Sequence, residues 1–220
     1  MLLSKILEEL LWGMGTSIEI FLLTLLFSIP LGLAVAAGRM SSFKPLQWFM
    51  KAYISIMRGT PLMLQLIVVF FGPYYIFGMT LSRDFRMIAV IIAFTINYAA
   101  YFAEIYRGGM NSIDKGQYEA AHALGLSKKQ TMLDIILPQT MKAILPPVFN
   151  ETITLVKDTA LVMAIGCHEL MKVTSGIVSR TSDITPFAVA AVIYLVMTFV
   201  LTLGAGKLER HFSRYDQKGE

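Results

Sequence analysis

Six polar residues lie within or beside long apolar runs, and their side chains have the chemistry to bind a small charged solute. An arginine binds a carboxylate through paired hydrogen bonds, an acid binds an ammonium group, and amides and hydroxyls supply further hydrogen bonds. Charged residues in membrane segments usually face a bundle interior or a wet cavity. The sequence therefore predicts a polar passage that contacts a zwitterion through Arg58, Thr60, Gln65, Asn97, Glu104 and Asp158.

Helical spacing supports this prediction, because it gathers polar residues on one face of each of three apolar runs. At 100° per residue, positions three, four or seven apart lie on the same side of a helix. Three such stripes indicate a polar lumen between helices. They are Arg58 with Gln65, Asn97 with Tyr101 and Glu104, and Asn150 with Thr154, Lys157 and Asp158.

Pairing among these same groups is the alternative interpretation. Arg58 could neutralise Glu104, and Glu104 lies one turn from Arg107. Lys157 is adjacent to Asp158 in the same way. For Arg58 and Glu104 both interpretations stay open, whereas we interpret Asp158 as a contact to the solute.

Thr60 is a candidate contact because the backbone around it is predicted to leave the helix. The segment RGTP, residues 58–61, predicts a helix break, because glycine is flexible and proline lacks an N–H group. A break at membrane depth exposes backbone groups to the lumen. We therefore include Thr60 among the candidate contacts.

The sequence predicts neither a catalytic centre nor a metal site in the chain itself. Three histidines are scattered, and the single Cys167 excludes an internal disulfide and a cysteine-only metal site. Cys167 precedes His168 directly, but adjacent residues on a helix point apart. We expect no enzymatic activity, no cofactor and no nucleic-acid binding.

The elements that must position the candidate residues are apolar helices. The chain has 220 residues, of which 55% are hydrophobic and 15% charged, and its mean hydropathy is +0.62. Soluble domains carry about 25% charged residues, and a bilayer is crossed by about 20 apolar residues. We predict one all-α integral membrane domain over residues 1–220, with an interfacial helix over 1–15 and five spans over about 17–37, 52–71, 87–106, 144–166 and 186–205.

The distribution of Lys and Arg predicts the orientation. An odd number of spans puts the chain ends on opposite sides. The flanks on one side carry 12 positive residues, whereas those on the other side carry 5. Because positive residues favour the cytoplasm, we expect the N-terminus outside, the C-terminus inside, and the loop 111–140 in the cytoplasm.

This loop is polar and rich in helix formers. The stretch EAAHALGLSKKQTMLDIILPQT begins as a helix that Gly125 would stop, since glycine takes left-handed backbone angles cheaply. Ser127 would cap a second helix, and Pro138 would end it. An ordinary solvated loop explains these features equally well from the residues alone.

The same stretch resembles the EAA loop of ABC-importer permeases. That motif reads E-A-A, three residues, G, nine residues, then I-x-L-P, and both gaps agree. The segments RGTPLMLQ, AAYFAEIYRGG and LVKDTAL resemble the polar amino-acid branch of these permeases. The motif positions in this chain are Glu119, Ala120, Ala121, Gly125, Ile135, Leu137 and Pro138.

The resemblance implies a MetI-like fold in a bacterial plasma membrane. It implies that the loop 111–140 is a coupling helix that docks on a separate ABC ATP-binding subunit, and that this subunit binds ATP and magnesium. The chain itself has no Walker A pattern. It further implies an extracellular or periplasmic amino-acid-binding protein, and a second permease copy or a sister permease as partner.

Two other functions compete with this interpretation. An ATP-independent secondary amino-acid carrier would need an internal repeat, which is not evident, and would leave the EAA loop unexplained. A membrane scaffold that only recruits an ATPase has no need to bury charge. Within the leading interpretation, the sequence does not separate glutamine, cystine, arginine or a similar amino acid as substrate.

Overall fold

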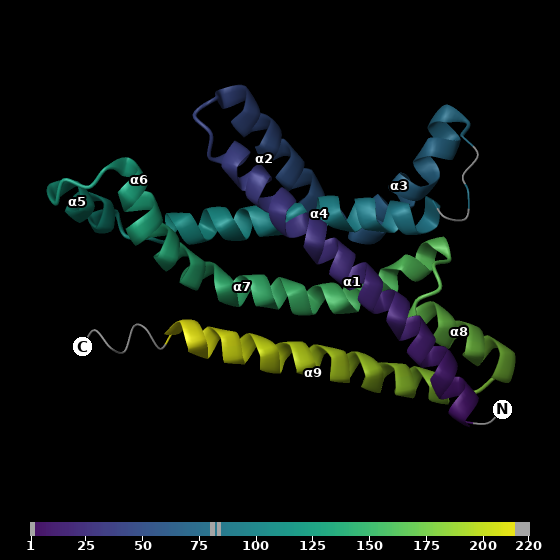
Figure 1. Cartoon of the computed structure of the whole chain (residues 1–220). Coiled ribbons are helices and arrows are strands. Elements are labelled where there is room, and N and C mark those ends of the chain that lie inside the picture. Colours follow the sequence, from purple (N-terminus) through teal and green to yellow (C-terminus); the bar gives the residue numbers. More distant parts are fainter. Residues whose placement is uncertain (1–2, 80–81, 83–84, 214–220) are drawn as a thin grey trace.

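The chain folds into a bundle of long helices around one central helix (Figure 1). In the computed structural model, residues 3–79, 82 and 85–213 are described, and all regular elements in these ranges are helical. The α-helices are α1 (Leu3–Arg39), α2 (Lys44–Gly59), α3 (Leu62–Phe77), α4 (Phe85–Asn111), α5 (Lys115–Ala123), α6 (Lys128–Gln130), α7 (Leu137–Asp158), α8 (Leu170–Thr181) and α9 (Thr185–Ser213). A π-helical segment (Thr131–Ile136) precedes α7 and a 3-10 segment (Thr159–Ile165) follows it.

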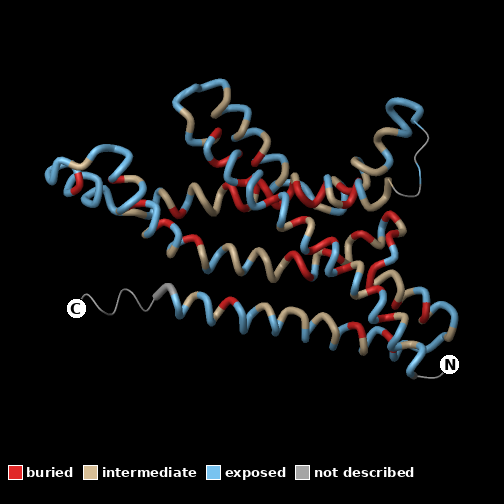
Figure 2. The backbone as a smooth tube through the Cα atoms, viewed as in Figure 1, coloured by how far each residue is buried: buried red, intermediate tan, exposed pale blue. Residues whose placement is uncertain are grey.

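Helix α4 is the centre of the core. Its Phe94, Tyr98 and Phe102 are almost fully buried, and Figure 2 shows buried residues along much of its length. Leu66 of α3 and Leu155 of α7 pack into the same cluster. This arrangement places the polar residues of α4 beside α2, α3 and α7, which carry or flank the other candidates.

Within the described residues, three helices are long and apolar enough to cross a membrane, namely Ser4–Arg39, Phe85–Asn111 and Thr185–His211. Two bent pairs raise the number to five if each counts as one span. The pair α2 and α3 bends by 106°, and the pair Lys128–Ile165 and Leu170–Thr181 bends by 54°. An all-helical membrane protein with three to five candidate spans is therefore confirmed.

The predicted elements differ from the structure at two places. Residues 3–15 form no separate helix, because α1 continues without interruption from Leu3 to Arg39. The predicted span 52–71 is divided at Thr60 and Pro61, as the RGTP segment predicts. Pro61 has no N–H group to continue the backbone hydrogen bonds of α2. Thr60 is extended, with φ −124° and ψ 148°.

The loop 111–140 and the described end of α9 lie at one end of the bundle, and α8 lies with the first turns of α1 at the other (Figure 1). Three charges used for the orientation, Arg83, Arg214 and Lys218, lie outside the described residues, as do Met1 and Leu2 of the predicted interfacial helix. Helix α9 packs on α7 and α8 but leaves most of its apolar side chains exposed (Figure 2).

Candidate solute site and coupling loop

Side-chain amides hold the break between α2 and α3. Gln65 Nε2 donates hydrogen bonds to the Met57 carbonyl at 3.0 Å and to Thr60 Oγ1 at 2.7 Å. Asn97 Nδ2 donates to the same Met57 carbonyl at 3.1 Å and to Gln65 Oε1 at 2.9 Å. The last carbonyls of a helix lack helical partners, so these amides satisfy groups that α2 leaves open.

Three of the six residues predicted to contact the solute, namely Thr60, Gln65 and Asn97, thus lie together. They are held by hydrogen bonds within the protein. Asn97 is only 3% exposed, and its amide nitrogen is fully engaged with α2 and α3. Thr60 is exposed and also donates to the Ile56 carbonyl at 2.8 Å. The structure therefore gives Asn97 and Gln65 a positioning role at the break.

The pairing of Arg58 with Glu104 does not form. Glu104 instead accepts two close hydrogen bonds from Arg107, with Nε to Oε1 at 3.0 Å and Nη2 to Oε2 at 2.6 Å. The guanidinium of Arg58 lies 5.2 Å from the ring centroid of Tyr101. Both carboxylate oxygens of Glu104 are engaged, so Arg58 keeps its hydrogen-bond donors available.

A cavity of about 370 Å³ lies beside Arg58. Its charged lining consists of Arg39, Lys51, Arg58 and Glu104. Lys51 and Arg58 are seven residues apart on α2, which puts them on one face of the helix. Because Arg107 neutralises Glu104, the surplus charge of this cavity is positive, and the cavity favours a carboxylate.

Asp158 is fixed by the central helix. It lies at the end of α7, where the chain tightens into the 3-10 segment, and its Oδ2 accepts a hydrogen bond from the Tyr98 hydroxyl at 2.7 Å. The rings of Tyr98 and Tyr101 lie 6.2 Å apart between centroids. Neighbouring tyrosines of α4 thus connect the carboxylate of Asp158 to the cation of Arg58.

Glu151 is a candidate that the sequence analysis missed. It is half-buried and makes no hydrogen bond or ion pair with any described residue. Arg58 and Asp158 both lie close enough to act on its charge. The signal was its spacing of seven residues from Asp158, which puts both acids on one face of α7.

The predicted polar stripe on α7 is correspondingly only partly right. Asn150 and Lys157 are exposed, whereas Thr154 is half-buried on the side of the two acids. Asn150 lines a separate cavity of about 450 Å³ between α7 and α9. The site on the α4 side is therefore one cation, Arg58, and two acids, Glu151 and Asp158.

The loop 111–140 begins as predicted. Asp114 caps α5 by accepting a hydrogen bond from the Gly116 amide at 2.6 Å. Gly125 takes a left-handed φ of 75°, and the Leu126 amide donates back to the Ala121 carbonyl at 3.1 Å. Ala121 is buried, whereas Glu119, Ala120 and Gly125 are exposed.

The second half of the loop departs from the prediction at Pro138. Ser127 and Gln130 form a capping box that starts α6, as expected. Pro138, however, lies in the first turn of α7 and does not end the helix. The Leu137 amide donates a hydrogen bond to the Met132 carbonyl, one residue further back than in an α-helix. The helical hydrogen-bond pattern thus changes next to Pro138, which lacks an N–H group.

The tip of the loop carries exposed apolar side chains despite its polar sequence. Leu124 is 78% exposed, and Leu133 and Leu137 are also exposed. A cavity of about 370 Å³ opens between α5 and the following turns, with Tyr118 and His122 in its lining. Exposed apolar groups around a well-capped helix are typical of a surface that another protein covers.

The chain resembles known amino-acid permeases over almost its whole length. It is 36% identical over 208 residues to the arginine transport system permease protein ArtQ of Bacillus subtilis, which covers 94% of both chains. It is 36% identical over 208 residues to the L-cystine transport system permease protein TcyB of the same organism, covering 94% of this chain and 87% of that one.

A solved structure agrees with the fold. The crystal structure of an amino acid ABC transporter with histidines superimposes with a TM-score of 0.88 at 34% identity, covering 94% of this chain and 96% of that chain. The family described as binding-protein-dependent transport system inner membrane component matches residues 28–214. This chain therefore belongs to that family of ABC-importer permease subunits, among its amino-acid permeases.

Proposed function

We propose that this chain forms the membrane passage of an ATP-driven importer for a polar L-amino acid. Its partners are a separate ATP-binding subunit, an external amino-acid-binding protein and a second permease copy or sister permease. The observation that carries the proposal is the common placement of Arg58, Glu151 and Asp158 beside the tyrosines of α4. A zwitterion needs both signs of charge, and this site provides them.

The site suggests how the substrate is held. The α-carboxylate binds Arg58, with Lys51 and Arg39 in the adjoining cavity, and the ammonium group binds Asp158 and Glu151. Asn97, Gln65 and Thr60 keep the break between α2 and α3 in place, and Glu104 fixes Arg107. At the end of the site that holds the ammonium group, Glu151 and Asp158 supply two negative charges, which favours cationic and neutral amino acids over anionic ones.

The loop 111–140 supplies the mechanical connection. It lies on the cytoplasmic side, with the N-terminus outside. The ATP-binding subunit holds ATP and magnesium, and ATP-driven closure of two such subunits moves the docked loops and opens the passage outward. Hydrolysis then restores the inward-facing state. We assign the docking contact to the exposed Glu119, Ala120, Gly125, Leu137 and Pro138, whereas the buried Ala121 packs inside the loop.

The test is uptake of labelled L-arginine, L-glutamine, L-cystine and L-glutamate by cells that express the chain with its ATPase and binding protein. The control carries an ATPase-dead partner. We expect uptake of cationic or neutral amino acids that disappears in the control. Persistent uptake would establish an ATP-independent carrier instead, and uptake of glutamate alone would contradict the assigned charge preference.

A further inference from the structure

The 3-10 segment Thr159–Ile165 connects the candidate solute site to the end of the bundle opposite the loop 111–140 (Figure 1). It follows Asp158 directly and ends at Gly166, where a left-handed φ of 73° stops the helix. Helices of this type rarely exceed about four residues, because their hydrogen-bond geometry is poorer than that of an α-helix. The seven residues of this segment therefore need support from the helices around them.

Helix α4 binds this segment at both ends, and at the start the Tyr98 hydroxyl donates to Asp158 Oδ2 at 2.7 Å. At the other end, Arg86 Nη1 donates to the Gly166 carbonyl at 2.9 Å. Arg86 and Tyr98 are twelve positions apart on α4, which is about 18 Å. Asp158 and Gly166 are eight positions apart, which is about 16 Å in a 3-10 helix. Because the two lengths match, the segment runs antiparallel along α4 between the two hydrogen bonds.

Arg86 has few other contacts that orient it. Its Cζ lies 5.9 Å from the ring centroid of Phe70 on α3, so the guanidinium is held against an aromatic face. Its Nε is buried and has no hydrogen-bond partner among the described residues. No acid of the described ranges forms an ion pair with it. The bond to Gly166 is therefore the one directional contact of this guanidinium in the part of the chain that the structure describes.

Apolar packing holds the segment sideways. Val162 and Ile165 are buried in one cluster with Leu66 of α3. Such packing is non-directional, so by itself it does not fix the rotation of the segment or its position along α4. The hydrogen bonds at Asp158 and Gly166 do so, because each joins one atom of the segment's ends to one atom of α4.

We propose that Arg86 is a positioning residue for the solute site. It does not touch the solute. Its bond to Gly166 fixes the far end of the 3-10 segment, and the segment in turn holds the Asp158 carboxylate against Tyr98. A charged donor suits this task, since charge-assisted hydrogen bonds are about twice as strong as neutral ones. The inference rests on the proposed role of Asp158 in binding the ammonium group.

Loss of this bond would release the segment at one end. A 3-10 helix rises about 2.0 Å per residue and an α-helix about 1.5 Å, so seven residues that change to α-helix shorten by about 3.5 Å. Asp158 and Gly166 would then be drawn together, and the carboxylate would move relative to Tyr98. The oxygen of Asp158 that faces the solute would no longer be preorganised.

The test is equilibrium binding of labelled L-arginine and L-glutamine to the purified complex of this chain with its ATPase. The external binding protein is left out, so the measured Kd belongs to the membrane site. Arg86→Met removes the donor but keeps an unbranched side chain that packs on Phe70. We expect it to raise Kd about 10-fold. In an Asp158→Asn background the same change should alter Kd by less than about 2-fold, because Arg86 acts through Asp158.

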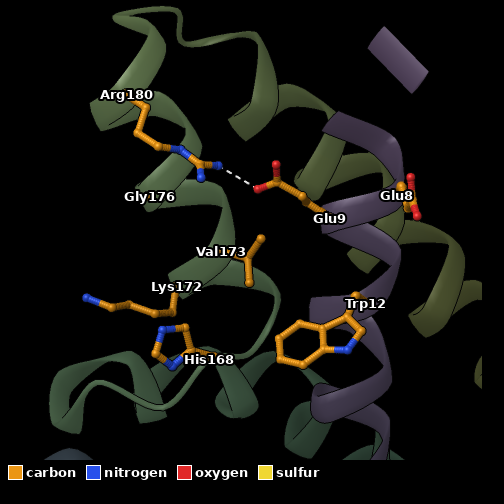
Figure 3. A pocket seen from close by; sticks show the side chains of 8 residues that line it. All are labelled: Glu8, Glu9, Trp12, His168, Lys172, Val173, Gly176 and Arg180. Carbon is orange, nitrogen blue, oxygen red and sulfur yellow. Dashed lines mark hydrogen bonds and ion pairs between the residues drawn. The ribbon is translucent and has the colours of Figure 1, made fainter. Parts of the chain in front are cut away.

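Arg180→Met is the matched control. Arg180 lies at the same end of the bundle, but it lines the cavity between α1 and α8 and pairs with Glu9, with 2.5 Å between Nη2 and Oε2 (Figure 3). Its loss removes a cation without touching the 3-10 segment, so Kd should not change. Arg86→Lys keeps a charged donor and should recover most of the affinity. Arg86→Gln is measured in parallel, so the comparison stands even where Arg86→Met does not assemble.

Thermal unfolding in detergent accompanies each variant, because a positioning role predicts a loss of affinity in a complex that is still folded. An unchanged Kd in both Arg86→Met and Arg86→Gln would overturn the inference. An equal loss of affinity with and without Asp158→Asn would overturn it too, and would leave Arg86 a structural contact only. If the wild-type complex bound neither amino acid, the proposed function itself would fail, and this inference with it.

Discussion

The Tyr98 hydroxyl donates a hydrogen bond to Asp158 Oδ2 at 2.7 Å, and this bond joins the central helix to the end of α7. Tyr98 is 2% exposed and rigidly packed, so it fixes the carboxylate before any substrate arrives. The second oxygen of Asp158 makes no hydrogen bond with a described residue. Preorganisation of this kind lowers the entropy cost of binding.

Asp158→Asn should therefore reduce uptake while leaving the complex assembled. Loss of one charge-assisted contact lowers kcat/KM by about 10- to 100-fold, in line with about 1.5–3 kcal/mol. Uptake is compared with co-purification of the ATPase, and exposed Asn150→Ala is the control on the same helix. Equal losses of uptake and assembly would mean that Asp158 is only structural.

Glu151→Gln should alter selectivity more than it alters total activity. Removing one of the two acids leaves Asp158 alone to attract positive charge, so uptake of a cationic amino acid should fall about 10-fold more than uptake of a neutral one. Lys157→Gln changes an exposed neighbouring charge and should not shift this ratio. The measurement is competition between labelled arginine and glutamine.

Gly125 is under a backbone constraint at the tip of the loop. At its φ of 75°, alanine costs roughly 1–2 kcal/mol, and an aspartate adds a charge at the proposed docking surface. Gly125→Asp should abolish coupled uptake while the chain still inserts. Gly206→Ala, on α9 with open space around the added Cβ, should retain uptake. Normal uptake and ATPase association in Gly125→Asp would reject the coupling assignment.

Gly109 allows α4 to approach α7. A Cβ atom added there would overlap Ile144 Cγ2, so Gly109→Ala should destabilise the chain by about 1–3 kcal/mol. Ile144→Ala removes that methyl group, and the double variant should recover part of the loss. Thermal unfolding in detergent measures the cycle, and strictly additive losses would show that the two residues do not compete for space.

Glu169 connects three helices from a fully buried position. Its carboxylate accepts hydrogen bonds from the Met171 and Lys172 amides of α8 at 2.7 Å each. It also accepts from the Tyr194 hydroxyl of α9 at 3.2 Å and from the Ser17 hydroxyl of α1 at 3.5 Å. Glu169→Ala removes the cap of α8 and should cost about 2–4 kcal/mol. Tyr194→Phe should cost less, since both amide contacts remain. A smaller loss for Glu169→Ala than for Tyr194→Phe would contradict this ranking.

Much of the fold is predictable from sequence because the bilayer imposes long apolar runs. The helices α1, α4 and α9 contain the runs 17–37, 87–106 and 186–205, and local capping signals located Gly125 and Ser127. What sequence did not reveal depends on contacts between distant segments. The pairing of Tyr98 with Asp158 and the bonds of Asn97 to α2 arise only when α4 packs.

Pro138 and Glu151 illustrate the remaining difficulty. A proline is normally a helix end, and only the register change of the π-helical segment makes Pro138 compatible with continuation. The polar stripe predicted for α7 omits Glu151, although its spacing of seven residues from Asp158 is visible in the sequence. The role of a charged residue inside a span is better predicted from the polar residues on the same helix face than from the lower mean hydropathy of the span.

The uninterrupted length of α1 bears on how the protein fits its membrane. Its 37 residues extend about 55 Å, whereas the hydrocarbon layer is about 30 Å thick. A helix with this surplus adapts to a thicker or thinner bilayer by changing its tilt. Because α1 is longer than the hydrocarbon layer, the fold should tolerate lipids of quite different chain length.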